Sequence, residues 1–180
     1  MRLTARHRTT RLLGAGAALL TALVVLTGCM KGPSMNDSNG QGASTADRLP
    51  ITTMVADYDE MLAQMRELIT TEAPGGVWSE VKPAQTLGGD KAVAGDDATI
   101  AVSPLWGYDL AFPSDPDARA ALVAALGAIG EAHGFSPVQT YVDRADEVQA
   151  VADDAFGAEY QIGSKLNSTL SYTTGSHPAE

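Results

Sequence analysis

Apolar residues recur every three or four positions between residues 51 and 69, with acidic and amide side chains between them. This period predicts an amphipathic α-helix whose apolar stripe packs on a core. Pro50 suits the first turn of such a helix, and the run from Glu72 to Gly76 ends it. Its three methionines favour core packing over an adaptable binding surface. The stripe consists of Ile51, Met54, Val55, Tyr58, Met61, Leu62, Met65, Leu68 and Ile69.

A second helix is predicted to begin after Ser114. The Ser114 hydroxyl can cap the first turn, Pro116 fits that turn, and Asp115 and Asp117 favour the positive end of the helix dipole. Gly134 is placed to cap the other end. Small residues on its apolar face would let this helix lie close to a sheet. That face is predicted to hold Ala118, Ala121, Leu122, Ala125, Leu126 and Ile129.

Strand patterns flank this second helix. Apolar and β-prone residues fill the stretch 99–112, with clean alternation from Trp106 to Phe112, and another strand is predicted over 135–142. Strand, helix and strand in this order suggest a crossover unit, right-handed if the two strands are parallel neighbours.

The rest of the chain is less regular until its C-terminal third. One short strand is predicted near 77–81, followed by a long loop through residue 97. Two further strands are predicted at 147–152 and 158–174, with a hairpin turn between them and a bulge or second turn at Gly163-Ser164. In the last run, one parity is predicted to be buried and the other wet. The buried parity holds Tyr160, Ile162, Leu166, Leu170 and Tyr172.

These elements predict a single α+β domain over residues 49–175. Its antiparallel or mixed sheet of about four strands would be packed by two helices. The tail 176–180 is expected to be frayed.

The N-terminus has the three parts of a secretory signal peptide. Arginines form a basic head, an apolar stretch of 15 residues runs from Leu12 to Leu26, and small residues close it. That stretch is shorter than the roughly 20 residues that a membrane-spanning helix needs. Residues 1–28 are therefore predicted to be a cleaved signal peptide.

The stretch ends in Leu26, Thr27, Gly28 and Cys29, which resemble the bacterial lipobox. The resemblance implies cleavage before Cys29 and modification of that residue with S-diacylglycerol and an N-acyl group such as palmitate. The alternative is an ordinary signal peptide with Cys29, the only cysteine, as a bystander. If the lipobox is used, residues 29–48 form a lipidated, flexible, Gly- and Ser-rich tether. The expected location is the outer face of the cytoplasmic membrane, with the lipid as anchor.

Cleavage makes the chain more acidic. It leaves eight basic residues against 22 acidic ones, a formal net charge of −14. Such a surface argues against a nucleic-acid partner. The acidic pairs Asp96-Asp97 and Asp153-Asp154 lack the spacing of a calcium loop and are expected to be solvated charge. No zinc cluster or phosphate-binding loop appears in the sequence, so no metal or cofactor is predicted.

The order of these features resembles the LppA-like lipoproteins of mycobacteria and other actinobacteria. A signal peptide with lipobox, a tether, a long helix, Trp78, a strand-helix-strand unit and closing strands follow one another. The closing strands run from Tyr160-Gln161-Ile162 to Leu170-Ser171-Tyr172-Thr173-Thr174-Gly175. The resemblance implies a cell-envelope lipoprotein with an α+β domain and no established reaction. Mycobacterial members carry extra cysteines in the mature domain, and their absence here implies that any family disulfide is missing.

The sequence gives little support to an enzymatic function, and no catalytic residue is predicted. His133 at the end of the second helix is expected to interact with the helix dipole, and His177 lies in the expected mobile tail. No Gly-x-Ser-x-Gly nucleophile turn accompanies them.

Three functions stay open on the sequence. The favoured one is a non-catalytic interaction module, in which the sheet or the first helix docks an envelope protein. The second is a carrier of an apolar ligand or lipid, and the third is an envelope hydrolase that uses a pair of carboxylates. A carrier cavity would be lined by residues such as Met54, Met61, Met65, Trp106, Tyr108 and Leu170.

Overall fold

A computed structural model describes residues 47–180. The predicted signal peptide, the lipobox Leu26–Cys29 and nearly all of the tether lie outside the described residues. Among the helices that are described, none has the length and apolar character of a membrane span.

The domain is α+β, as predicted, but its sheet has eight strands instead of about four. The helices are α1 (Ile51–Glu72), α2 (Lys91–Ala94) and α3 (Pro116–Ala132). The strands are β1 (Trp78–Lys82), β2 (Gln85–Gly88), β3 (Thr99–Val102), β4 (Leu105–Tyr108), β5 (Gln139–Arg144), β6 (Glu147–Asp153), β7 (Glu159–Ser164) and β8 (Ser168–Thr173).

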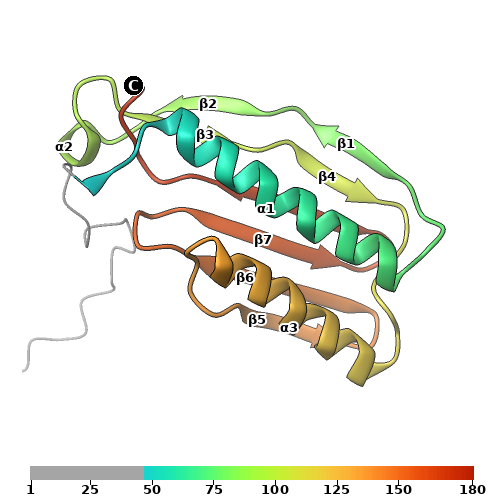
Figure 1. Ribbon diagram of the computed structural model, residues 1–180. Coiled ribbons are helices and arrows are strands. Elements are labelled where there is room, and N and C mark those ends of the chain that lie inside the picture. The colour runs from blue at the N-terminus through green and yellow to red at the C-terminus, as the bar shows by residue number, and fades with distance from the viewer. Residues whose placement is uncertain (1–46) are drawn as a thin grey trace, which may run out of the picture. The chain divides into compact units, whose positions relative to one another are not determined.

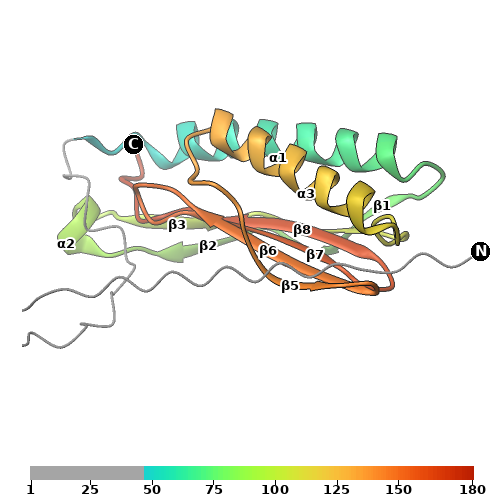
Figure 2. The ribbon, with the colours of Figure 1, turned by 90° about the horizontal axis from the view of Figure 1, so that it is seen from below.

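The two long helices lie side by side on the same face of the sheet (Figures 1 and 2). The main sheet order is β1-β4-β8-β7-β6-β5, β2 and β3 extend it beside β8, and every pairing is antiparallel. Alternate strand residues point toward the helices and join the apolar stripe of α1 in one core. The domain therefore has two layers, with helices on one side of a single sheet.

The first helix forms where the sequence predicts it. Its buried residues are those of the predicted stripe, except that Val55 and Leu68 are only partly buried. The second differs in its cap, because the Asp115 carboxylate and not the Ser114 hydroxyl accepts a hydrogen bond, at 2.8 Å from the Ala118 nitrogen.

The face that α3 presents to the sheet is also rotated from the predicted one. Ala118, Ala121 and Ala125 are exposed, whereas Gly127 and Gly130 are buried. A Cβ atom at Gly130 would lie 2.5 Å from Cε1 of Tyr160, so the missing side chain makes room for this ring. The prediction failed because it treated alanines as the close-packing residues.

The strand predictions need five corrections. The predicted loop after residue 82 contains β2 and α2, and the single strand predicted over 99–112 is interrupted at Ser103-Pro104, so it forms β3 and β4. The long C-terminal run, for which a bulge or a second turn at Gly163-Ser164 was predicted, is a hairpin whose turn lies just after these residues, and Leu166 in that turn is 88% exposed. The strands that flank α3 are not neighbours, since β8, β7 and β6 lie between β4 and β5. The last strand before the C-terminal third begins at Gln139, because Phe135 forms only an isolated bridge, with Asp154.

The C-terminal tail is packed and not frayed. His177 is fully buried and pairs with Thr99, and the backbone nitrogen of Ile51 donates to the carbonyl of Pro178 at 2.9 Å. The predicted domain boundary also moves, because Arg48 is 5% exposed and belongs to the folded unit. The start and end of the domain are therefore bound to each other.

Candidate interaction surfaces

The residues predicted to line a carrier cavity are packed together in the core. Met61, Met65, Tyr108 and Leu170 are fully buried, Met54 is 7% exposed, and Trp106 packs against them from the rim. The Arg66 guanidinium lies 4.1 Å from the Trp106 ring centroid and covers it. The clefts described below, within residues 47–180, are lined by other side chains.

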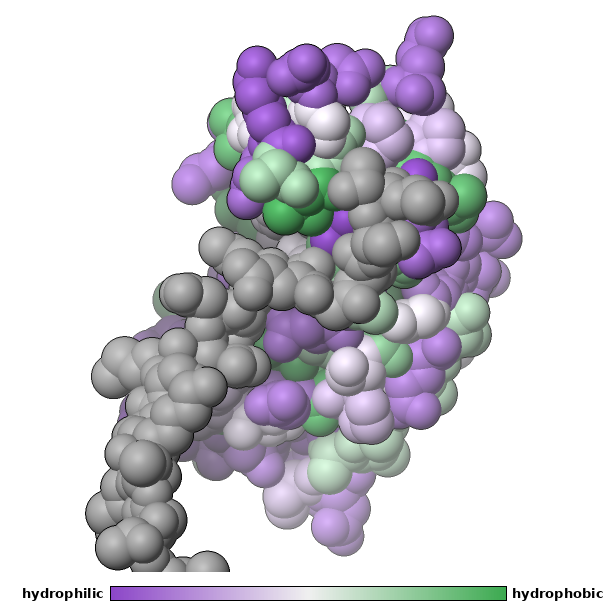
Figure 3. Space-filling model, turned by 90° about the vertical axis from the view of Figure 1, so that its left-hand side faces the viewer, coloured by the Kyte–Doolittle hydropathy of each residue, from purple (hydrophilic) through white to green (hydrophobic). Residues whose placement is uncertain are grey.

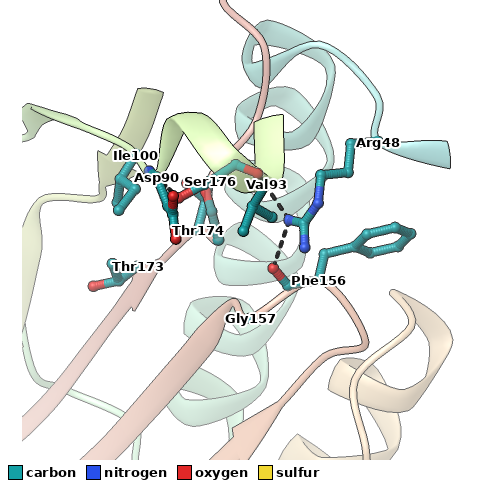
Figure 4. Close-up of a pocket in the computed structure, with 10 residues that line it drawn as sticks. Arg48, Asp90, Val93, Ile100, Phe156, Gly157, Thr173, Thr174 and Ser176 are labelled. Carbon is teal, nitrogen blue, oxygen red and sulfur yellow. Dashed lines mark hydrogen bonds between the residues drawn. The ribbon is translucent and has the colours of Figure 1, made fainter. Parts of the chain in front are cut away.

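One cleft of about 290 Å³ lies beside Arg48, near the first of the described residues. Figure 3 views this end, where hydrophilic and hydrophobic residues lie side by side. Arg48 reaches across the cleft and donates from one terminal nitrogen to the carbonyls of Phe156 and Ser176, both at 2.8 Å (Figure 4). Because backbone carbonyls already engage this guanidinium, the cleft is a structural junction and a poor anion site.

The tail residue His177 strengthens this junction. Its Nδ1 lies 2.9 Å from the carbonyl oxygen of Leu49, so the tautomer with a proton on Nδ1 donates there. Burial lowers the pKa of His177, an effect that the Leu49 carbonyl opposes and Arg48 reinforces. The imidazole that was expected in a mobile tail is therefore a buried, neutral part of the fold.

Polar contacts also hold α1 to the sheet and to α3. The hydroxyl of Tyr58 donates to Asp154 at 2.5 Å, and that of Tyr172 donates to Asp59 at 2.9 Å. Burial, followed by these hydrogen bonds to carboxylates, raises the pKa of both phenols. His133, which was expected to interact only with the dipole of α3, also contacts α1, because its Nδ1 lies 2.9 Å from Asp57.

Asp154 is thus not the solvated charge that the sequence predicted. Its other carboxylate oxygen accepts hydrogen bonds from the backbone nitrogens of Phe156 and Ala158, at 2.8 and 2.7 Å. The neighbouring Asp153 lies directly opposite Glu159 in the β6–β7 register. Burial raises the pKa of Asp153, and the negative charges of Glu159 and Asp154 raise it further. Within residues 47–180, no group of three or more metal-binding side chains gathers.

The opposite face of the sheet is covered by neither α1 nor α3 (Figure 2). Its side chains alternate with the core residues of β6, β7 and β8, and they surround a hollow of about 410 Å³. All of the lining residues belong to strands of this one sheet, so the hollow has no opposing wall. We call this surface the bare face, and it consists of Leu105, Tyr141, Gln149, Val151, Gln161, Gly163, Thr169 and Ser171.

The bare face combines amide and hydroxyl groups with one prominent aromatic ring. Tyr141 is 67% exposed and is the extra residue of a bulge in β5, between Thr140 and Val142. The sequence predicted a wet parity in the last strands, which includes Gln161 and Thr169, and this part is confirmed. It missed Tyr141, since the bulge breaks the alternation that would have placed this side chain.

Fold and surfaces together define a two-layer α+β domain with one packed and one bare sheet face. A family model described as "LppA: Lipoprotein confined to pathogenic Mycobacterium" matches residues 31–178. The chain therefore belongs to the LppA family of lipoproteins, as its sequence resemblance indicated.

Two solved structures are similar to this chain. The crystal structure of LppA from Mycobacterium tuberculosis aligns with a TM-score of 0.49 at 14% identity, covering 78% of this chain and 82% of that one. A DUF4853 family protein from Actinomyces odontolyticus aligns with a TM-score of 0.42 at 12% identity, covering 74% and 71%. No curated protein matches the chain.

Proposed function

We propose that this protein is a lipid-anchored, non-catalytic interaction module of the cell envelope. In this proposal the bare face docks an envelope protein, and the lipid on Cys29 supplies the location. The observation that carries the proposal is a sheet that is packed on one side and uncovered on the other. A protein partner fits this shape, because a face without an opposing wall cannot enclose a small ligand.

The engagement of the histidines supports a non-catalytic role. A general base must reach the proton that it removes, within about 3.2 Å or through one water. The Nδ1 atoms of His133 and His177 instead face Asp57 and the Leu49 carbonyl, and both side chains serve to join elements of the fold.

The bare face is tested by crosslinking in the intact host. A photoreactive residue at Gln161, on the bare face, should capture an envelope protein. The same residue at Gln64, an exposed position of α1 on the helical side, is the matched control. Equal capture at both positions, or capture only at Gln64, would overturn the use of the bare face.

The anchor has a separate test. We expect Cys29→Ser to block lipidation, so that the protein is released from the membrane or is not processed. Cell fractionation and mass spectrometry of the N-terminal peptide measure this change. Unchanged membrane attachment of the variant would refute the anchor.

The carrier alternative predicts a different result. Native mass spectrometry of the protein purified from its membrane should show the chain with only the Cys29 modification. Additional bound lipid that survives removal of the anchor would overturn the interaction module.

A further inference from the structure

A second surface of different chemistry lies at the edge of the sheet, away from the bare face. Strand β5 pairs only with β6, so the backbone groups along its other side lack a neighbouring strand within the described residues. Such an edge is a template for one more strand. The bulge between Thr140 and Val142 interrupts the edge and limits an added strand to a short segment.

An apolar cleft of about 250 Å³ accompanies this edge, on the side of the sheet that α3 covers. Residues of α3 line one side of the cleft, and residues of β5 and β6, together with Val138, line the other. The volume is below the roughly 300 Å³ at which sites for drug-sized ligands begin, and it suits a single aliphatic side chain. The lining residues are Arg119, Ala120, Val123, Ala124, Val138, Thr140, Asp143 and Val148.

Carboxylates outnumber cations in the two segments that lead into the cleft, the first turn of α3 and the β5–β6 turn, and this excess favours a basic partner. Arg119 is the cation within the cleft, and it is already engaged by Asp143 at 3.0 Å and by the carbonyl of Ser114 at 3.1 Å. Arg144 pairs with Glu147 at 3.7 Å. No ion pair among residues 47–180 neutralises the exposed carboxylates of Asp117 and Asp146.

We propose that the groove between α3 and β5 binds an extended peptide segment of a protein partner. The segment adds to β5 as a short strand, places one aliphatic side chain in the cleft, and carries lysine or arginine beside it. A helix flanking an edge strand offers both parts of this recognition, main-chain pairing for affinity and a side-chain pocket for specificity. The inference shares the proposed role in protein binding but uses a different surface.

A second copy of this chain is a poorer occupant. Pairing β5 with β5 would bring together two chains of the same strongly negative net charge, and like charges repel. A basic peptide instead gains from the same charges.

The test is selection of a randomised heptapeptide library on the full mature chain, residues 29–180, with Cys29→Ser for solubility. We expect enriched peptides with one aliphatic residue flanked by basic ones. Ala124→Leu fills the cleft from an exposed helix position, so it should weaken binding about 10- to 100-fold, the equivalent of one lost aliphatic burial. Ala125→Leu, also exposed but outside the cleft, should change binding less than about twofold.

Two further measurements complete the test. Asp146→Asn should weaken binding and reduce its salt dependence, and amide hydrogen exchange should slow in β5 when peptide is bound. The proposal is wrong if no selected peptide distinguishes Ala124→Leu from Ala125→Leu. It is also wrong if β5 becomes protected on concentrating the chain alone, which would indicate self-pairing. Crosslinking from Gln161 is independent of these variants, so failure here and failure of the bare face are distinguishable.

Discussion

The two faces of the sheet are formed by residues that are adjacent in sequence, but one face packs in the core and the other lies on the surface. On β8, Leu170 is fully buried under α1, whereas the neighbouring Ser171 belongs to the bare face. Residues only one position apart in sequence thus serve the core and the surface, because side chains alternate across a strand. The comparison teaches that stability and recognition can be altered separately along the same strand.

The largest difference is expected from truncating one residue on each face. Leu170→Ala should destabilise the domain by about 2–5 kcal/mol, through lost burial and the cavity that remains. Ser171→Ala should stay within about 0.5 kcal/mol of the parent. Urea denaturation of both variants measures the contrast, and equal losses would show that the bare face is part of the stabilising core.

A matched pair of tyrosines tests the polar contacts of the packed face. Tyr58→Phe removes the hydroxyl that donates to Asp154, and a hydrogen bond to a charged group contributes about 1.5–3 kcal/mol. Tyr141→Phe removes an exposed hydroxyl on the bare face and should change stability by less than about 0.5 kcal/mol. Thermal unfolding of the two variants compares them, and a larger loss for Tyr141→Phe would contradict the assignment of the faces.

Substitution of one glycine on each face compares the two faces through smaller changes in stability. Gly130→Ala would press against the buried Tyr160 ring, and the cost of overpacking exceeds the gain in helix propensity, so we expect a net loss of about 1–2 kcal/mol. On the bare face, Gly163→Ala would meet only the Thr169 hydroxyl, at 2.7 Å, and this side chain can rotate. That variant should be neutral by chemical denaturation. A neutral Gly130→Ala would mean that α3 is packed less closely than described.

The smallest effect concerns pH and the junction of the termini. Because burial lowers the pKa of His177 below its ordinary value of 6.5, the unfolded chain takes up a proton before the folded one. Stability should be fully present above pH 6.5 and decline as the pH falls from 6.5 toward the lower, folded-state pKa. Denaturation curves of His177→Gln should show a shallower loss of stability as the pH falls below 6.5. An unchanged slope would show that this imidazole is accessible to protons in the fold.

The sequence could predict what depends on local patterns. The periodic stripe of α1 and the alternation of β7 and β8 needed only neighbouring residues. Strand β2 was missed because all four of its residues are exposed, which leaves no alternation to detect. The contact between Arg48 and Ser176 joins residues 128 positions apart, and no local pattern announces such a pair.

The surfaces were predictable to a similar extent. The wet parity of β7 and β8 anticipated part of the bare face. The β5 cleft was not visible, because it combines α3, β5 and β6, and because the rotation of α3 placed Ala124 beside it.

Hydrogen bonds between residues 48–51 and 176–178 hold the two ends of the domain next to each other. The hydrogen bond between Ile51 and Pro178 means that a short linker could join residue 178 to residue 48. New ends could then be opened in the exposed β7–β8 turn, at Leu166, giving a circular permutant with the same core. Such a permutant would place the new chain ends at the β7–β8 turn and leave residues 48 and 178 covalently joined.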